Sequence, residues 1–304
     1  KTELSVRLAE QINGEIISAD SIQIYRHMDI GSAKVTLEEM HGIRHYLIDE
    51  LEPDEEFNIY IFQEKAKAAI KEIYQAGKIP IIAGGTGFYI QALLYDIDFK
   101  ENDEKNPVRE ELEQLAEKLG ENAPQVLHQK LQEVDPEAAA QIHANNIKRV
   151  IRAIEYFKQT GEKISQHNEE MHQKDSPYNF LYYVLTRDRK VLYERIDRRV
   201  DIMMENGLVD EVKKLKDMGC HRGQTSMQGL GYKEILDYLD GGCTLEEAVY
   251  ILKRDTRHFA KRQLTWFRRE KDVRWLDLDQ YQGNTDLILA DILKDCEQAE
   301  IVLK

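Results

Sequence analysis

Hydrophobic residues follow two different spacings in the first hundred positions of the chain. Two short continuous apolar runs, 15–19 and 78–84, are typical of strands that are buried on both faces. Segments 3–11, 57–76 and 88–95 instead carry apolar residues three and four positions apart, which is the spacing of one helix face. Strands that alternate with helices in this order predict a parallel sheet covered by helices. The same analysis predicts strands at 43–48 and 273–276, and later helices at 189–205, 208–218, 232–239, 245–269 and 284–297.

The pattern changes at about Lys100. From there to Ser176 every apolar pattern is helical, at 107–119, 124–132, 136–141, 146–159 and 163–172. We therefore expect a helical domain inserted into an α/β core. Strand character returns at 180–186, and we expect this strand to rejoin the sheet. The predicted domains are the first part of the core, the helical insert and the second part of the core, at 1–99, 100–176 and 177–304.

Charge is unevenly distributed along the 304 residues. The formal net charge of −14 suggests at first that a nucleic-acid partner is excluded. Segment 253–274 nevertheless holds nine basic and three acidic residues, whereas segment 101–121 holds eight acidic and three basic ones. Because binding to a polyanion depends on the local charge, the basic segment keeps a nucleic-acid partner open.

Cysteine usage and hydropathy narrow the class of protein. No apolar run approaches the roughly 18 residues that cross a membrane, so we expect no membrane partner. The three cysteines are widely spaced and form no C-x-x-C pair. This favours a reduced, cytoplasmic protein without a disulfide framework or a zinc site.

The first candidate site is the pair Lys1-Thr2, which opens a predicted helix. Such a pair remains when a phosphate-binding loop, G-x-x-x-x-G-K-[ST], loses its glycines, and we expect those glycines and a strand ahead of Lys1. In this kind of loop the Lys ammonium group contacts phosphate and the Thr hydroxyl holds Mg²⁺. Taken alone, a Lys-Thr pair is more often a solvated helix end.

Polar residues follow both apolar strands at their carboxyl ends, where open parallel sheets bind ligands. Asp20 follows the first strand, and it can act as a general base or as an outer-sphere ligand of Mg²⁺; the alternative is a helix cap. Gly84-Gly85-Thr86-Gly87 follows the other strand. Its glycines allow close approach of either a ligand or a helix, and Thr86 adds a hydroxyl group.

Arginines on the predicted helix 189–205 suggest a diphosphate site. Leu192, Ile196 and Val200 mark the apolar face of this helix, and Arg195 and Arg199 flank it. A single helical Arg usually forms surface ion pairs, whereas several that converge on a phosphate loop can bind a diphosphate.

The predicted helix 245–269 carries a basic stripe. Leu252, Phe259 and Trp266 are seven positions apart, and we expect them to form its buried stripe. Four basic residues lie within about 60° of one another on another side, given roughly 100° per residue: Arg254, Arg257, Lys261 and Arg268. They indicate either a solvated face or, in an otherwise acidic chain, a track for RNA phosphates.

Several strings along the chain form an ordered set: Lys1-Thr2, Ser18–Tyr25, Met28–Lys34, Gly84–Tyr89, Arg149 with Arg152–Glu155, Leu192–Ile196, Arg199–Asp201, Gly231–Glu234, and Ala260–Gln263 with Thr265–Arg268. Together they resemble the bacterial tRNA dimethylallyltransferase family, over nearly the whole chain. The resemblance implies a P-loop NTPase-like α/β fold, a parallel sheet covered by helices with an all-helical insertion domain. One departure is Gln228-Gly229-Leu230, where the family pattern suggests Ala-Ile or a similar pair after Gln.

The resemblance implies transfer of a dimethylallyl group from dimethylallyl diphosphate to N6 of an adenosine next to the anticodon of tRNA, with Mg²⁺ as cofactor. Asp20 would orient the amine and accept its proton, and Thr86 would lie close to the base or the diphosphate. The residues implied to bind the diphosphate are Lys1, Thr2, Arg195 and Arg199, with Mg²⁺ held through Thr2. The residues implied to contact the tRNA anticodon stem-loop are Asp20, Ser21, Ile22, Gln23, Thr86, Arg109, Lys148, Arg149, Val150, Ile151, Arg152 and Lys261.

Three other functions share part of this pattern. A small-molecule kinase would share the phosphate loop and the arginines, but it would not explain the helical insert. An isopentenyl transferase acting on a free adenine nucleotide would share the chemistry and have less use for the insert. A non-catalytic RNA-binding adaptor would need the basic stripe but not Asp20 with Lys1. We expect the protein to be a monomer.

Overall fold

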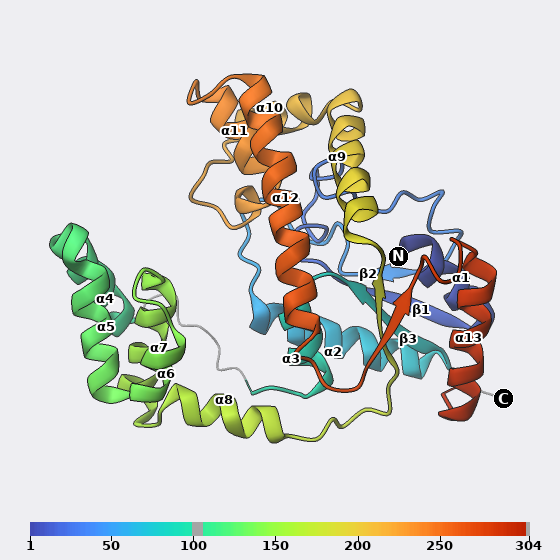
Figure 1. The fold of residues 1–304 in the computed structure, drawn as a ribbon, viewed down its shortest axis with the longest axis horizontal. Helices are drawn as coiled ribbons and strands as arrows, with labels where there is room; N and C mark the ends of the chain where they lie inside the picture. Colours follow the sequence, from blue (N-terminus) through green and yellow to red (C-terminus); the bar gives the residue numbers. More distant parts are fainter. Residues whose placement is uncertain (99–105, 302–304) are drawn as a thin grey trace. The chain divides into compact units, whose positions relative to one another are not determined.

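The chain divides into two compact units, which we describe separately. A computed structural model describes residues 1–98 and 106–301. Lys1–Leu94 and Tyr178–Lys304 form the core unit, and Tyr95–Pro177 form the helical unit (Figure 1). The predicted domain boundary between residues 99 and 100 lies outside the described residues. Among the helices described, none combines the length and the apolar character that a membrane span requires.

The first sheet of the core unit is parallel and is formed early in the chain. Strand β1 (Gly14–Ala19) lies between β2 (His45–Tyr46) and β3 (Ile79–Gly84). All six residues of β1 are buried, as expected for a strand covered on both faces. Of the strand predicted at 43–48, only His45 and Tyr46 pair with β1.

Helices pack against this sheet as the apolar spacing predicts. Helix α1 (Thr2–Ile12) places Val6 and Ala9 in one cluster with Ile16 of β1. Helix α2 (Ile59–Gln75) starts at Asn58, whose side chain accepts a hydrogen bond from the backbone N–H of Ile61. Helix α3 (Gly87–Leu94) follows β3 after the glycine-rich turn.

The second sheet corrects one prediction from the sequence. Strand β4 (Tyr182–Thr186) does not hydrogen-bond to the first sheet; it pairs in parallel with β5 (Val273–Asp277). Leu4 and Leu8 of α1 pack into a cluster with Ile288 and Ile292 of α13 (Thr285–Gln298), beside this second sheet. Helix α1 therefore packs on both sheets through apolar side chains, and among the described residues no strand of one sheet pairs with a strand of the other.

Four further helices complete the core unit: α9 (Arg189–Glu205), α10 (Leu208–Asp217), α11 (Tyr232–Leu239) and α12 (Leu245–Phe267). Asp188 caps α9 by accepting hydrogen bonds from two backbone N–H groups of its first turn. Thr244 and Glu247 form a capping box at the start of α12. The predicted buried stripe of α12 is wrong at its centre, because Leu252 is 2% exposed but Phe259 is 39% exposed.

The helical unit has its own hydrophobic core. Its helices are α4 (Pro107–Leu119), α5 (Ala123–Val134), α6 (Pro136–Gln141), α7 (Ile147–Thr160) and α8 (Ile164–Gln173). Leu112, Leu127 and Leu131 pack against Val150 and Ile151 of α7. Val150 and Ile151 are 0% and 5% exposed, so their side chains are not available to RNA, and this part of the predicted tRNA contact is corrected.

Candidate active site

The carboxyl ends of β1 and β3 bring Asp20 and Thr86 to the same edge of the sheet. Ala19 and Gly84 are register partners, and the backbone N–H of Thr86 donates to the carbonyl of Ala19 at 3.2 Å. A Cβ atom on Gly84 would lie 2.1 Å from the Ala19 carbonyl oxygen, so only glycine fits there. The turn after β3 is thereby held against the start of the turn that contains Asp20.

The two carboxylate oxygens of Asp20 differ in their contacts. Its Oδ1 atom accepts hydrogen bonds from the backbone N–H groups of Ile22 at 3.0 Å and Gln23 at 3.4 Å. In the part of the chain that the structure describes, its Oδ2 atom has no hydrogen-bond partner. One oxygen therefore stabilises the local turn, and the other remains available to a ligand.

Lys1 lies close to Asp20 and to two arginines of α9. Desolvation by the surrounding protein lowers the pKa of the Lys1 side chain, although the residue as a whole is exposed; the Asp20 carboxylate opposes this shift and Arg199 adds to it. Arg195 and Arg199 also lie near the backbone nitrogen of Lys1. Both arginines are exposed, and neither forms an ion pair among the described residues. The three predicted diphosphate-binding cations are therefore brought together.

Oxygen donors around Lys1 fit Mg²⁺. Thr2 is the first residue of α1, and its hydroxyl group makes no hydrogen bond in the described part of the chain. No group of three or more His, Cys, Asp or Glu side chains that could hold a metal occurs among the described residues. Mg²⁺ characteristically takes one or two protein oxygens and completes its shell with substrate phosphates and water. A hydroxyl group beside a cationic phosphate site matches that donor set.

Helix α12 explains the two glycines on either side of Thr86. The Gln263 side chain donates from Nε2 to the carbonyl of Gly85 at 2.7 Å, and a Cβ atom on Gly85 would lie 2.4 Å from that nitrogen. A Cβ atom on Gly87 would lie 2.3 Å from the indole of Trp266. Of the two readings of these glycines, close packing of a helix is therefore the one that the structure supports.

Ion pairs of two α12 arginines correct the predicted phosphate track. Arg257 pairs with Asp197 of α9, and Arg254 pairs with the adjacent Asp255 at 2.8 Å. Lys261 and Arg268 are exposed and form no ion pair among the described residues. The stripe is therefore split, and only part of its positive charge is available to a polyanion.

An aromatic cluster close to Asp20 was not predicted from the sequence. The Tyr89 ring stacks on Phe62 with centroids 4.4 Å apart and meets Phe57 edge-on at 5.8 Å. Burial, followed by the charges of Tyr25 and Asp20, raises the pKa of Tyr89. The family resemblance included the string Gly84–Tyr89. Nothing in the sequence near Tyr89 indicates that Phe57 and Phe62, from another part of the chain, pack against it.

Three neighbours of Asp20 were predicted to contact tRNA. Ser21 and Ile22 are half-buried, and Ile22 lies against Gly229. The side-chain amide of Gln23 donates to the carbonyls of Ser32 and Ala33, both at 3.3 Å. The amide nitrogen of Gln23 is thus engaged within the protein, and its contact with RNA stays a prediction.

The predicted RNA-binding cations of the helical unit gather around one carboxylate. Arg109 donates from Nε and Nη2 to Glu155, at 3.1 and 2.9 Å, and the side chain of Asn106 also donates to Glu155. Arg149 and Arg152 are exposed, as is Lys148. Desolvation by surrounding protein, then Arg109, lower the pKa of Arg152. Arg109 is therefore neutralised locally, whereas its neighbours on α7 are not.

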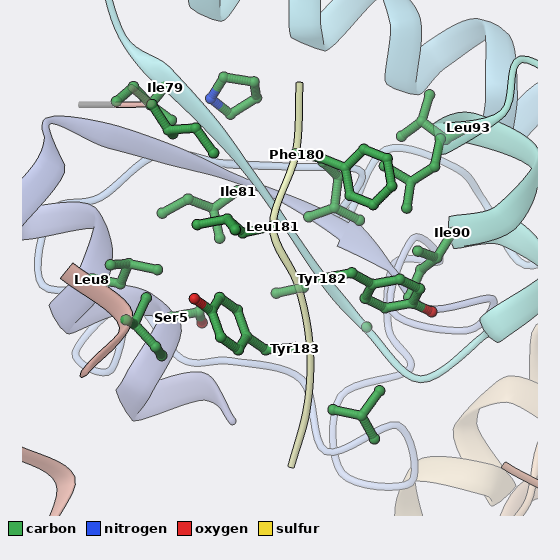
Figure 2. A pocket seen from close by; sticks show the side chains of 18 of the residues that line it. Ser5, Leu8, Ile79, Ile81, Ile90, Leu93, Phe180, Leu181, Tyr182 and Tyr183 are labelled. Carbon is green, nitrogen blue, oxygen red and sulfur yellow. The ribbon is translucent and has the colours of Figure 1, made fainter. Parts of the chain in front are cut away.

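A cavity of about 450 Å³ lies between the two sheets of the core unit. Its walls include Ile79 and Ile81 of β3 on one side and Leu181 and Tyr183 on the other. Figure 2 shows the side chains of segment 180–183 alternating: Phe180 and Tyr182 point to the side of Leu93 and Ile90, and Leu181 and Tyr183 point to the side of Leu8. Lys1 also lines this mostly apolar cavity.

Comparisons with known proteins agree with one another. The IPP transferase family model matches residues 23–270. The chain is 61% identical over 302 residues to the tRNA dimethylallyltransferase of Lachnoclostridium phytofermentans, a match that covers 99% of this chain and 95% of that protein. It is 52% identical over 287 residues to the tRNA dimethylallyltransferase of Clostridioides difficile, covering 94% and 91% of the two chains.

Solved structures show the same likeness. The tRNA isopentenylpyrophosphate transferase of Bacillus halodurans is 46% identical, with a TM-score of 0.72 and coverage of 99% of this chain and 94% of that one. A eukaryotic dimethylallyltransferase acting on tRNA is 29% identical, with a TM-score of 0.82 and coverage of 98% and 76%. The parallel sheet and its covering helices are thus shared with these enzymes.

Proposed function

This chain belongs to the IPP transferase family, and from that premise we propose that it transfers a dimethylallyl group from dimethylallyl diphosphate to N6 of an adenosine next to the anticodon of tRNA. The family and the α/β fold predicted from the sequence are confirmed. The observation that carries the proposed chemistry is the approach of Lys1, Arg199 and Asp20 to one another at the carboxyl end of β1.

In this proposal Asp20 acts on the attacking amine, and the cations act on the leaving diphosphate. The exocyclic amine of adenosine attacks C1 of the dimethylallyl group, the C1–O bond breaks, and diphosphate leaves with the bonding electrons. Oδ2 of Asp20 accepts the proton that the amine must lose. Thr86, held at the same sheet edge, can orient the base or the diphosphate.

Positive charge stabilises the departing diphosphate. Lys1, Arg195 and Arg199 supply it, and the N-terminus of α1 contributes backbone N–H groups that favour an anion. Mg²⁺, held by Thr2 together with the diphosphate oxygens, would supply further neutralisation when bound.

Unpaired cations of both units are proposed to bind the tRNA anticodon stem-loop. In the helical unit these are Lys148, Arg149 and Arg152, and in the core unit Lys261. A target base in a stacked loop must be turned out to reach Asp20. The cytoplasmic location and the monomeric state stay predictions.

One assay tests the proposal. Full-length protein is incubated with labelled dimethylallyl diphosphate and, in parallel, with unmodified tRNA, AMP or no acceptor. We expect label to enter tRNA alone, and we expect EDTA to abolish the transfer. Label in AMP instead would support the free-nucleotide enzyme, and phosphoryl transfer from ATP without prenylation would support a kinase.

A further inference from the structure

A carboxylate from a distant helix binds the 28–34 loop. The backbone N–H groups of Asp29 and Ile30 donate to Oε2 of Glu211, at 3.0 and 2.8 Å, and that of Gly31 donates to Oε1 at 3.0 Å. Glu211 lies on α10, 180 positions beyond Gly31. Three successive N–H groups thus form an anion-binding nest, and the protein's own carboxylate fills it.

Tyr232 extends this arrangement by one residue. Its hydroxyl group donates to Oε1 of Glu211 at 2.8 Å and accepts from the backbone N–H of Ser32 at 3.1 Å. A Cβ atom on Gly31 would lie 2.6 Å from the Tyr232 ring, so glycine is required where the ring packs on the loop. Four successive backbone N–H groups are therefore held by two side chains of α10 and α11.

A buried ammonium group holds the loop from within the same segment. Lys34, whose side chain is 5% exposed, pairs with Asp29 at 2.6 Å and with Asp49 at 2.5 Å, and it donates to the carbonyl of Tyr25 at 2.7 Å. The hydroxyl group of Ser32 donates to the carbonyl of Met28 at 2.6 Å. The loop is thus fixed from two directions.

The backbone conformation of the loop requires such contacts. His27, just before the loop, and Ala33, within it, have positive φ angles of 66° and 49°, which residues with side chains disfavour. Strained residues persist where surrounding contacts over-determine the conformation, and they concentrate at functional sites. Glu211, Tyr232 and Lys34 supply those contacts here.

Gln23 connects the loop to Asp20. Its side-chain nitrogen donates to the carbonyls of Ser32 and Ala33, and its backbone N–H donates to Oδ1 of Asp20. A displacement of the loop would therefore move Gln23, and with it the turn that sets the direction of the Asp20 carboxylate.

We propose that Glu211 and Tyr232 are positioning residues of the transfer reaction, which hold the 28–34 loop so that Gln23 fixes the free oxygen of Asp20 toward the acceptor amine. This inference rests on the proposed function. In the described part of the chain, no hydrogen bond or ion pair joins either residue to Lys1, Arg195 or Arg199. We therefore expect their effect to fall on turnover of the acceptor and not on binding of the diphosphate.

Steady-state kinetics of Glu211→Gln and Tyr232→Phe in the full-length protein test the inference. We expect Glu211→Gln to lower kcat about 10-fold and Tyr232→Phe to lower it about 3-fold, with the KM for dimethylallyl diphosphate unchanged within about two-fold. Glu211→Asp keeps the carboxylate and should recover part of the loss. Hydrogen exchange of the 28–34 segment should rise in the order of the kcat losses.

Asp240→Asn is the matched control. Asp240 pairs with Lys216 of α10 at 2.7 Å and with Arg222, but it does not contact the loop. It should lower the melting temperature and leave kcat within about two-fold. Equal kcat losses in Asp240→Asn and Glu211→Gln at matched melting temperatures, or a raised diphosphate KM in Tyr232→Phe, would overturn the inference. Failure of the wild-type protein to prenylate tRNA would instead overturn the proposed function.

Discussion

Helix α9 bears two kinds of charge that behave differently. Toward α12, Asp197 pairs with Arg257, and Asp201 pairs with Lys253 at 2.5 Å. Arg195, by contrast, is exposed, forms no ion pair among the described residues and lies close to Lys1, as does Arg199. Basic residues on one pair of helices therefore divide into those that fix helix packing and those left to bind an anion.

The difference shows why counting basic residues does not locate a ligand site. Arg257 and Lys261 are equally basic in the sequence and share one predicted stripe. A neighbouring carboxylate already neutralises Arg257, so a phosphate group would have to displace it. Lys261 offers its charge without such competition, and the same holds for Arg149 relative to Arg109 in the helical unit.

The largest expected effect tests whether the carboxylate beside the unpaired cations lies at the reaction centre. Asp20→Asn should lower turnover by about 10²- to 10⁴-fold, the range for loss of a general base, because the amide cannot accept the proton. Affinity for tRNA should stay within a few-fold, since Ile22 and Gln23 can still bond to the amide oxygen. Single-turnover prenylation and filter binding measure the two quantities, and near-normal turnover would reduce Asp20 to a cap of its turn.

Two variants compare an unpaired basic residue of α9 with a paired basic residue of α12. Arg195→Ala should raise the KM for dimethylallyl diphosphate by about 10- to 100-fold, because charge-assisted hydrogen bonds to phosphate are lost. Lys253→Ala should leave this KM within about two-fold, since its partner is Asp201. The KM values are measured from initial rates over a range of dimethylallyl diphosphate concentrations. Similar KM values in both variants would contradict the distinction between paired and unpaired basic residues.

The helical unit permits the same comparison for RNA. Arg149→Ala with Arg152→Ala should weaken tRNA binding by about 10-fold at moderate salt and flatten the salt dependence, because two phosphate contacts are removed. Lys158 pairs with Glu111 at 3.4 Å, so Lys158→Ala is the control and should change little. Binding curves at several salt concentrations provide the test; equal slopes for both variants would show that pairing has no bearing on RNA contact.

The smallest effect concerns α12. Lys261→Ala should weaken tRNA binding by a few-fold and lower the slope of log K against log salt by about one. Arg254→Ala, which loses a pair with the adjacent Asp255, should leave the slope nearly unchanged. If the two variants shift the slope equally, the division of the stripe into paired and unpaired parts is wrong.

Local signals in the sequence predicted most helices and strands of this fold. Asp188 caps the helix that was predicted at 189–205 and found there, and Pro107 and Pro136 each open a predicted helix. The strand at 180–186 was also expected, but its partner was not. The apolar pattern of a segment indicates that it forms a buried strand. It does not indicate which other strand will pair with it, because pairing depends on the tertiary arrangement.

The positions of candidate site residues could be predicted where a motif lies at the end or start of a predicted element, whereas their chemical roles stay predictions. Asp20, Thr86 and Lys1 each lie at the end or start of a predicted element, so the parallel arrangement brings them to one edge. Glu211 gave no such signal, because its three hydrogen-bond donors are about 180 positions away. Val150 and Ile151 were included with their basic neighbours, although helical spacing turns them toward the core.

Trp266 of α12 packs against the glycine-rich turn, where it can serve as an intrinsic fluorescence probe. The chain contains two tryptophans. Trp266 lies against Gly87 and edge-on to Phe88 at 6.0 Å, and its buried indole nitrogen has no hydrogen-bond partner among the described residues. Trp275 is 39% exposed and can be replaced by Phe. The emission of the remaining indole would then follow movement of the backbone beside Thr86 during a single catalytic cycle, without any attached dye.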